Sequence, residues 1–404
     1  MKVLVFDNCL RLTGHRLHYA ALVADAFAYD HEVVLGLPDA IQREPQVVAL
    51  SSRSFRTDFY PVSTNTKPVK GIKDTLFTAL SARRCLIEMI KRCQPDLVAI
   101  PTADGLAILS GLLNLLPLPG LRGPKIDICV MRGPHRYANQ PIRQAISNAK
   151  WWLVRRGPWK RIMMMDPREW STAKKAIVNP ELLCPDPVPK QKYFDRQRCR
   201  ELLNLPLDGR IIVSVGPQNM RKGSDLLLKG FAAANLQQDD RLVMIGKIAP
   251  DISPMIASLK QQPEFGQRLI VRDEFVSEDE FQMAIVASDV VAIPYRSVNR
   301  PSGIVCRSMA WQRPLVMTNR GWLKWILDEF GAGFGANSSD STELGTTIKL
   351  ALDQSSEFQT TDSAAQFINF NTEENFLKTW ACGVDSNSDS IAQTMNFLNH
   401  RPQQ

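Results

Sequence analysis

The sequence predicts an α/β protein with two domains, each built on a parallel sheet that helices cover on both faces. Three observations support this class. Strand-like apolar runs alternate with segments of helical spacing along nearly the whole chain. The alternation passes through two similar halves and shows no short-period repeat. The chain also has 404 residues, more than one hydrophobic core comfortably holds.

The first half contains five apolar runs with the composition of buried strands, at Val3–Phe6, Glu32–Leu37, Leu97–Pro101, Ile126–Met131 and Ile162–Met165. Helical spacing marks other segments, at about 15–28, 75–93, 104–115, 137–156 and 167–175. Residues 38–72 are polar and contain proline and serine. We therefore expect an irregular insertion with short strands there.

The second half repeats the pattern, with strand-like runs at Ile211–Gly216, Arg241–Gly246, Ala287–Pro294 and Arg313–Thr318. Three prolines within the five residues Pro185–Pro189 exclude helix and mark an interdomain linker. We expect an N-terminal domain over 1–184 and a C-terminal domain over 185–360. Aromatic residues at helix-like intervals predict a helical segment over 361–382, and the polar residues 383–404 predict a mobile tail.

The bulk composition indicates a globular protein in a reducing compartment. Apolar residues make up 44% of the chain and charged residues 22%, which is ordinary for a soluble domain. No run of about 18 uncharged apolar residues occurs, so no membrane span is expected. Asp7 and Arg11 interrupt the first apolar run too early for a signal peptide. Eight scattered cysteines without a Cys-x-x-Cys pair predict reduced thiols, and hence a cytoplasmic protein.

Positive charge is concentrated in the first half. Residues 1–180 hold 26 lysines and arginines against 14 acidic residues, a net charge of +12, whereas the remainder holds 23 against 27, a net charge of −4. An anionic membrane surface, an acidic polymer or a phosphorylated acceptor would suit this charge. No zinc finger, RNA-binding aromatic signature or basic helix occurs, so no nucleic-acid partner is predicted.

The segment Ala149–Arg161 combines three tryptophans with five basic residues. Tryptophan rings settle at headgroup depth and cations settle on anionic lipid, so we expect peripheral membrane contact through 149–161. The alternative is a partly buried helix with a basic exterior.

A candidate anion site follows the apolar run that ends at Pro294. A Pro-Ser-Gly turn there opens a segment of helical spacing, and such a turn aims free backbone N–H groups at one point, which suits a phosphate. Neighbouring arginines could pair with a diphosphate. The candidate binding residues are Arg296, Arg300, Ser302, Gly303 and Arg307. The alternative is a capped helix with solvated arginines.

A second candidate follows the strand-like run that ends in Gly216. Arg221 and Lys222 begin the next helical segment, where the lysine ammonium can reach a phosphate near the helix N-terminus. The alternative is a solvated helix start.

The order of these motifs resembles the C-terminal half of retaining glycosyltransferases of the GT-B fold, specifically the large family-4 group. In that group a strand ends in glycine, an arginine and Lys-Gly follow, and an apolar strand precedes a glycine-containing donor loop. The motifs lie within 211–330. The resemblance implies two Rossmann-like domains facing a central cleft, with the helix at 361–382 crossing back. It also implies metal-independent, retaining transfer of a hexosyl group from a nucleotide sugar.

The resemblance further implies roles for single residues. Arg221 and Lys222 would stabilise the leaving diphosphate, although Pro217 replaces the usual arginine after the glycine. Gly14 and His15 stand where the family has a Gly-Gly turn near donor and acceptor, and His135 stands where related enzymes contact the transferred sugar. For both histidines the alternative is an ordinary loop or helix-start residue.

Asp104 follows another strand-like run, at Thr102-Ala-Asp104. Its carboxylate could bind an acceptor hydroxyl or act as a base. Plain capping of the following helix is the alternative.

One departure concerns the two glutamates that the family carries eight positions apart. They fall on Asn299 and Arg307 here. Asn299 can still bond sugar hydroxyls, whereas Arg307 supplies donors but no acceptor. A non-catalytic GT-B scaffold that binds a sugar, a phosphate or a partner protein is therefore the alternative function. An epimerase would need paired acid and base residues, which we cannot assign.

The expected ligands follow from this interpretation. No cofactor is predicted beyond the nucleotide-sugar donor, and the acceptor is a sugar, a lipid-linked or a small molecule. No Asp-x-Asp flanked by apolar strand residues and no histidine–carboxylate cluster occurs, so no metal site is predicted.

Overall fold

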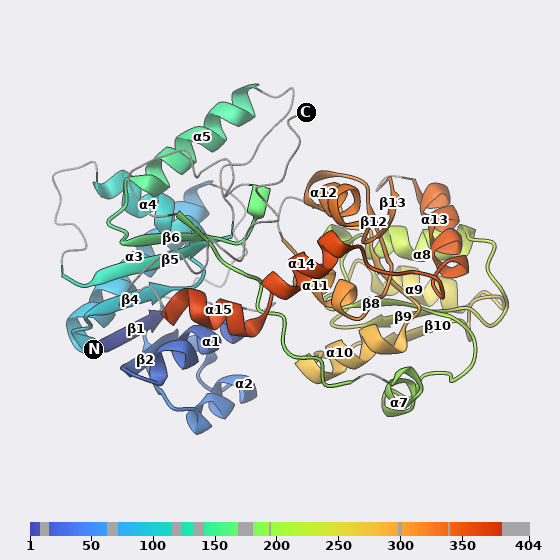
Figure 1. Cartoon of the computed structure of the whole chain (residues 1–404), viewed down its shortest axis with the longest axis horizontal. Helices are drawn as coiled ribbons and strands as arrows, with labels where there is room; N and C mark the ends of the chain where they lie inside the picture. Colours follow the sequence, from blue (N-terminus) through green and yellow to red (C-terminus); the bar gives the residue numbers. More distant parts are fainter. Residues whose placement is uncertain are drawn as a thin grey trace. The chain divides into compact units, whose positions relative to one another are not determined.

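The computed structural model describes residues 1–8, 16–62, 72–114, 123–131, 141–168, 181–193, 195–297, 301–337 and 340–381. The chain divides into two compact units (Figure 1). Unit 1 contains Met1–Pro187 and the helix that starts at Glu373, and unit 2 contains Val188–Thr372. Of the two helices within the expected range 361–382, the first belongs to unit 2 and the second to unit 1.

Unit 1 is built on a seven-stranded sheet with the order β3-β2-β1-β4-β5-β6-β7, and its pairings are parallel. Its strands are β1 (Lys2–Phe6), β2 (Glu32–Pro38), β3 (Arg56–Tyr60), β4 (Leu97–Ile100), β5 (Lys125–Val130), β6 (Arg161–Met164) and β7 (Glu181–Leu183). The central strands are almost wholly apolar because helices cover both faces of a parallel sheet.

The helices of unit 1 form two layers (Figure 1). One layer holds α3 (Ile72–Cys93), α4 (Asp104–Asn114) and α5 (Pro141–Arg155), and the other holds α1 (Arg16–Ala28) and α15 (Glu373–Ala381). The short elements η1 (Asp39–Ile41), α2 (Pro45–Val48) and η2 (Ala49–Ser52) lie between β2 and β3.

Helix α15 is fixed to unit 1 by its core and by a buried arginine. Phe376 and Trp380 are buried in the same apolar cluster as Val3, Val5 and the side chains of α1. Arg161, at the start of β6, donates to the carbonyl oxygens of Thr379 (3.2 Å) and Trp380 (3.0 Å). Its guanidinium also pairs with the buried Asp127 at 2.7 Å.

Unit 2 is built on a six-stranded parallel sheet with the order β10-β9-β8-β11-β12-β13. The strands are β8 (Ile211–Val215), β9 (Arg241–Ile245), β10 (Leu269–Arg272), β11 (Val290–Ile293), β12 (Leu315–Thr318) and β13 (Gly333–Ala336). Successive strand residues point to opposite faces. Val213 and Val291 therefore join one apolar cluster, whereas Ile212 and Val290 join the other.

Helices cover both faces of this second sheet. Their bounds are α7 (Arg196–Leu202), η3 (Met220–Lys222), α8 (Ser224–Ala233), α9 (Ser253–Lys260), α10 (Glu278–Ala287), α11 (Gly303–Ala310), α12 (Gly321–Phe330), α13 (Ser341–Asp353) and α14 (Asp362–Phe370). Side chains of α10, α11, α12 and α14 pack into one cluster, and side chains of α8, α9 and α13 pack into the other.

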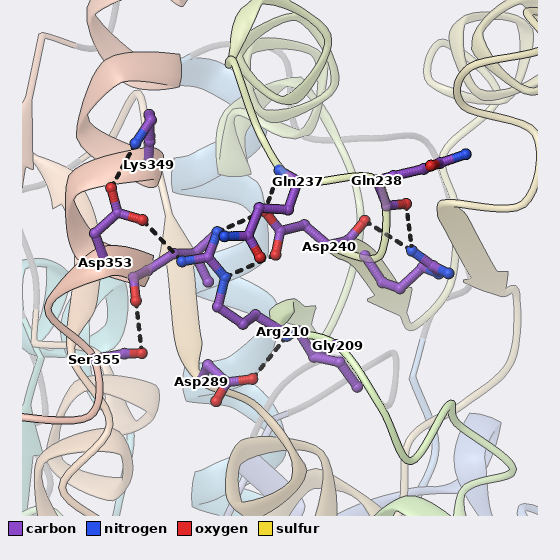
Figure 2. A network of polar contacts seen from close by, with 12 residues as sticks. Gly209, Arg210, Gln237, Gln238, Asp240, Asp289, Lys349, Asp353 and Ser355 are labelled. Carbon is purple, nitrogen blue, oxygen red and sulfur yellow. Dashed lines mark hydrogen bonds and ion pairs between the residues drawn. The ribbon is translucent and has the colours of Figure 1, made fainter.

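Figure 2 shows a polar network that ties the amino edge of this sheet to α13. Arg210, just before β8, forms two 2.8 Å hydrogen bonds with the buried Asp240 before β9. Its third bond, also 2.8 Å, reaches Asp353 at the end of α13. The hydrogen bonds that Arg210 donates to Asp240 and Asp353 raise the pKa of Arg210, and the bonds that Asp353 accepts from Lys349 and Arg210 lower the pKa of Asp353.

The α/β class and the sequence-predicted elements in the described residues are found in the structure. Three short strands were missed: β7, β10 and β13. The predicted helix at 167–175 lies almost wholly outside the described residues, as does the tail at 383–404. Helix α10 begins at Glu278, where Ser277 and Glu280 form a reciprocal capping box.

Candidate functional site

The strand order of unit 2 reverses direction between β8 and β11. From β8 the chain proceeds outward through β9 and β10, and from β11 it proceeds the other way through β12 and β13. Ligands of open α/β sheets bind outside the carboxyl ends of the strands at such a switch point. The predicted anion-binding residues of unit 2 follow these two strands.

The turn after β8 is stabilised by the left-handed conformation of Gly216 and by the buried side-chain amide of Gln218. Gly216 has a φ of +98°, and its N–H donates to the oxygen of Ile245 at 2.8 Å. The Gln218 side chain donates to the oxygens of Ser214 (3.0 Å) and Gly216 (2.9 Å) and accepts from the Ser224 hydroxyl at 2.9 Å. Gln218 was missed in the sequence, where a lone amide between two motifs gave no signal.

Gly223 brings the start of α8 against the end of β11. Its φ is +70°, and a Cβ added there would lie 1.9 Å from the carbonyl oxygen of Pro294. Only a glycine permits this approach, because both the left-handed conformation and the missing side chain are needed. The residues just before Gly223 and just after Pro294 consequently lie together.

Lys222 and Tyr295 meet at this junction. The lysine Nζ donates to the phenol oxygen of Tyr295 at 2.6 Å and lies 3.8 Å from the centroid of its ring. Tyr295 is itself fixed, because its carbonyl oxygen accepts from the Thr318 hydroxyl at 2.8 Å. The Asn219 side chain caps the backbone N–H of Lys222 at 3.0 Å. The ammonium group is thus held at the carboxyl end of β11.

Arg221 adds a second positive charge beside this lysine. Its side chain is exposed. Its backbone oxygen accepts from the N–H of Arg296 at 3.1 Å. The guanidinium makes no hydrogen bond or ion pair with a residue that the structure describes.

Arg296 is engaged within unit 2. Its guanidinium forms two bonds with Asp225, one of them 2.6 Å, and a 2.8 Å bond with the oxygen of Met220. Burial alone would raise the pKa of Asp225, but the bonds and charge of Arg296 outweigh it and lower that pKa. The same bonds raise the pKa of Arg296. Its predicted contact with a diphosphate stays a prediction.

Helix α11 begins at Gly303, with Ser302 at the N-cap position. The Ser302 side chain makes no capping bond, and its carbonyl oxygen accepts from the N–H of Val305 at 2.9 Å. The first N–H groups of a helix have no partner within the helix, so this end can receive an anion. Asn299 and Arg300 lie outside the described residues.

Arg307 is turned toward α10. The side chain is buried, its Nε donates to Glu278 at 3.0 Å, and its Nη1 donates to the oxygen of Gly303 at 3.1 Å. The guanidinium carbon also lies 5.5 Å from the ring centroid of Phe281. The predicted contact of Arg307 with the donor stays a prediction, and this buried ion pair was not foreseen.

Unit 1 has a polar cluster at its own switch point, between β1 and β4. The buried Asp7, just after β1, accepts from Arg16 at 3.1 Å and from the Thr102 hydroxyl at 3.0 Å. Arg16 also donates to Thr102 at 3.1 Å and to Asn8 at 2.6 Å. The sequence analysis did not predict this cluster as a site. The one indication in the sequence was Asp7, a charged residue directly after the apolar first strand.

The remaining sequence-predicted residues of unit 1 are only partly described. Asp104 is the first residue of α4 and is half-buried, where a carboxylate interacts favourably with the helix dipole. Gly14, His15 and His135 lie outside the described residues. Within the described ranges, no group of three or more His, Cys, Asp or Glu side chains could hold a metal ion.

Comparisons with known proteins match the second half of the chain to a family. Residues 209–354 match the family model described as "Glycosyl transferases group 1". No curated protein sequence matches the chain.

Solved structures show the fold of the whole chain. Sucrose-phosphate synthase from Thermosynechococcus elongatus is 15% identical, with 98% of each chain covered and a TM-score of 0.65. The Anabaena protein HepE in complex with UDP-glucose is 12% identical, with 98% of this chain and 99% of that chain covered and a TM-score of 0.64. WaaG, a glycosyltransferase of lipopolysaccharide biosynthesis, is 13% identical over 99% of each chain, with a TM-score of 0.60. The fold is GT-B, as predicted.

Proposed function

We propose that this protein is a glycosyltransferase that moves a sugar from a nucleotide-sugar donor to an acceptor with retention of configuration. The observation that carries the proposal is the junction of Lys222 and Tyr295 at the switch point of unit 2. Two findings support it: the family match covers this junction, and a structural neighbour is recorded with UDP-glucose.

The proposed chemistry places the donor diphosphate beside Lys222 and Arg221. As the bond between the sugar carbon and the phosphate oxygen breaks, negative charge grows on the departing diphosphate. An ammonium group, a guanidinium group and the free N–H groups at the start of α11 would offset that charge. The ion pair of Arg296 with Asp225 would hold the turn that carries Lys222. No metal or other cofactor is part of this proposal.

The acceptor side of the proposal concerns unit 1. Asp104 would bind an acceptor hydroxyl or accept its proton, and His135 would orient the transferred sugar near Gly14 and His15. The acceptor is a sugar, a lipid-linked or a small molecule. Cytoplasmic location with peripheral membrane contact through 149–161 belongs to the same proposal. Among the described residues, no helix has the length and apolarity needed to cross a bilayer.

A non-catalytic scaffold is the second candidate function. One observation favours it: the guanidinium of Arg307, which the resemblance aligns with a family glutamate, is buried against Glu278. A scaffold of this kind would bind sugar, phosphate or a partner protein without transferring a sugar.

Binding and turnover measurements separate the two functions. Calorimetry with a panel of nucleoside diphosphates and nucleotide sugars should identify a ligand, and incubation with the sugars should release nucleoside diphosphate slowly by hydrolysis. Lys222→Ala removes a charge-assisted bond to phosphate, which weakens diphosphate binding by about 10- to 100-fold. Lys229→Ala, on the exposed face of α8, is the matched control. No binding across the panel refutes the proposal, and binding without any turnover favours the scaffold.

A further inference from the structure

Helix α5 exposes the side that a surface helix normally buries. Trp151 and Val154 are its buried side chains. The exposed fractions of Ile142, Ile146 and Trp152 are 77%, 50% and 47%. Helices on the surface of a globular protein ordinarily turn their apolar stripe to the core and their polar face to water.

Helical geometry places these exposed apolar residues on one stripe. At about 100° per residue, Ile142, Ile146, Ala149 and Trp152 fall within a sector about 120° wide, whose centre lies roughly opposite Trp151. Ala145 and Ala149 are exposed between them. The outer face of α5 is therefore apolar along about three turns.

The orientation of α5 is set by its packing on α4. A Cβ added to Gly111 of α4 would lie 1.7 Å from the carbonyl oxygen of Leu153, so the two backbones touch there. The Asn114 side chain also donates to the oxygen of Arg156 at 2.7 Å. Rotating α5 to bury its apolar stripe would break both contacts.

The sequence around the stripe is strongly basic. Between Gly105 and Met165 the sequence has ten basic residues and a single acidic one, Asp127. That carboxylate is buried and paired with Arg161. Basic residues on or directly after α5 are exposed, namely Arg143, Lys150 and Arg156. The guanidinium of Arg156 lies 4.8 Å from the ring centroid of Trp152.

We propose that the outer face of α5 binds the surface of an anionic phospholipid bilayer. An apolar stripe flanked by cations suits the boundary between acyl chains and negatively charged headgroups, with the tryptophan at headgroup depth. A second copy of this chain fits less well, because two such faces would bring like charges together. This inference rests on the membrane contact proposed above, for which it names the surface and the lipid class, and it does not depend on sugar transfer.

The structure corrects the expectation that the three tryptophans of 149–161 face lipid. Trp151 and Trp159 are buried, and the indole N–H of Trp159 donates to the oxygen of Val154 at 2.8 Å. Trp152 is the tryptophan on the exposed stripe. Ile142 and Ile146, which precede the expected range, complete the lipid-facing surface.

Vesicle sedimentation with the full chain tests the proposal. We expect binding to vesicles of phosphatidylcholine mixed with phosphatidylglycerol, little binding to phosphatidylcholine alone, and release at high salt. Replacing Arg143, Lys150 and Arg156 together by glutamine should weaken partitioning about 100-fold, at roughly fivefold per charge. A matched control replaces the exposed Arg43, Lys229 and Lys260 by glutamine and should weaken it far less.

The apolar stripe is tested separately. Ile142→Gln with Ile146→Gln should reduce partitioning about tenfold or more. Val48→Gln with Leu350→Gln changes comparably exposed side chains elsewhere and should have little effect. Bromine-labelled lipid should quench tryptophan fluorescence, and Trp152→Phe should remove most of that quenching.

Three results would overturn the proposal. The first is no binding to anionic vesicles at low salt. The second is equal binding by the α5 variants and their controls, with circular dichroism showing all of them folded. The third is a dimer, detected by light scattering, that becomes monomeric when Ile142 and Ile146 are replaced. That result would assign the face to a second copy of the chain. Nucleotide binding by unit 2 is measured independently of vesicle binding. Failure of the membrane proposal can therefore be distinguished from failure of the proposed glycosyltransferase function.

Discussion

Replacing Gly223 by alanine tests whether the contact between α8 and β11 builds the Lys222 site. The added Cβ faces two obstacles: a φ of +70° and the Pro294 oxygen at 1.9 Å. The left-handed conformation costs an alanine about 1–2 kcal/mol. Displacing the backbone oxygen adds about 1–3 kcal/mol, as other overpacking changes do. We expect a total destabilisation of about 2–5 kcal/mol.

Gly331→Ala is the matched control. Gly331 ends α12 in a similar conformation, with a φ of +57°, but its added Cβ would meet only the methyl group of Thr361 at 3.3 Å. The free energy of unfolding of this control should therefore fall only by the conformational cost of about 1–2 kcal/mol. Urea unfolding of both variants measures the difference.

Calorimetry with a nucleoside diphosphate adds a second readout. Gly223→Ala should weaken binding because the clash moves Pro294, next to Tyr295, whereas Gly331→Ala should leave binding unchanged. Equal loss of stability in the two variants, or unaltered nucleotide binding by Gly223→Ala, would refute this reasoning.

Three further changes have defined outcomes. Tyr295→Phe removes the 2.6 Å bond to Lys222 but keeps the ring, so diphosphate affinity measured by calorimetry should fall about fivefold; no change would contradict a positioning role. Asp127→Ala leaves the buried Arg161 without its carboxylate and should lower the free energy of unfolding in urea by about 3–5 kcal/mol. Because Arg161 also holds α15, this helix should become more sensitive to proteolysis. A destabilisation smaller than that of a surface substitution would contradict the importance of the buried pair. The lowered pKa of Asp225 adds stability above its ordinary value of 3.8, and this contribution is lost as the pH falls through the lowered value; Asp225→Asn should flatten that part of the acid-unfolding curve.

The fold was predictable because its strongest signals are local. The buried strands β8 and β11 are apolar runs that composition alone distinguishes. The missed strand β13 reads Gly-Phe-Gly-Ala, and its two glycines are typical of a turn. It is a strand because β12 pairs with it, which is a tertiary cause. Strand β7, with three residues, is too short to show a period.

The site was less predictable because its decisive contacts join distant positions. Arg296 was expected to meet a diphosphate, but its partner Asp225 lies 71 residues earlier. Arg307 likewise pairs with Glu278, 29 residues away. Sequence reasoning selected the segments that follow β8 and β11 and the cations they carry, and the contact of these cations with a donor stays a prediction. It could not tell which cations would already be neutralised inside the protein.

The ion pair of Arg307 with Glu278 constrains any attempt to redesign this helix. A glutamate introduced at position 307 alone would place a buried carboxylate against the carboxylate of Glu278, beside Phe281 and without the present ion pair. We therefore expect a sign reversal at position 307 to destabilise the protein less when position 278 reverses with it. A charge-swapped double variant is the shortest route to a carboxylate at that point of the helix.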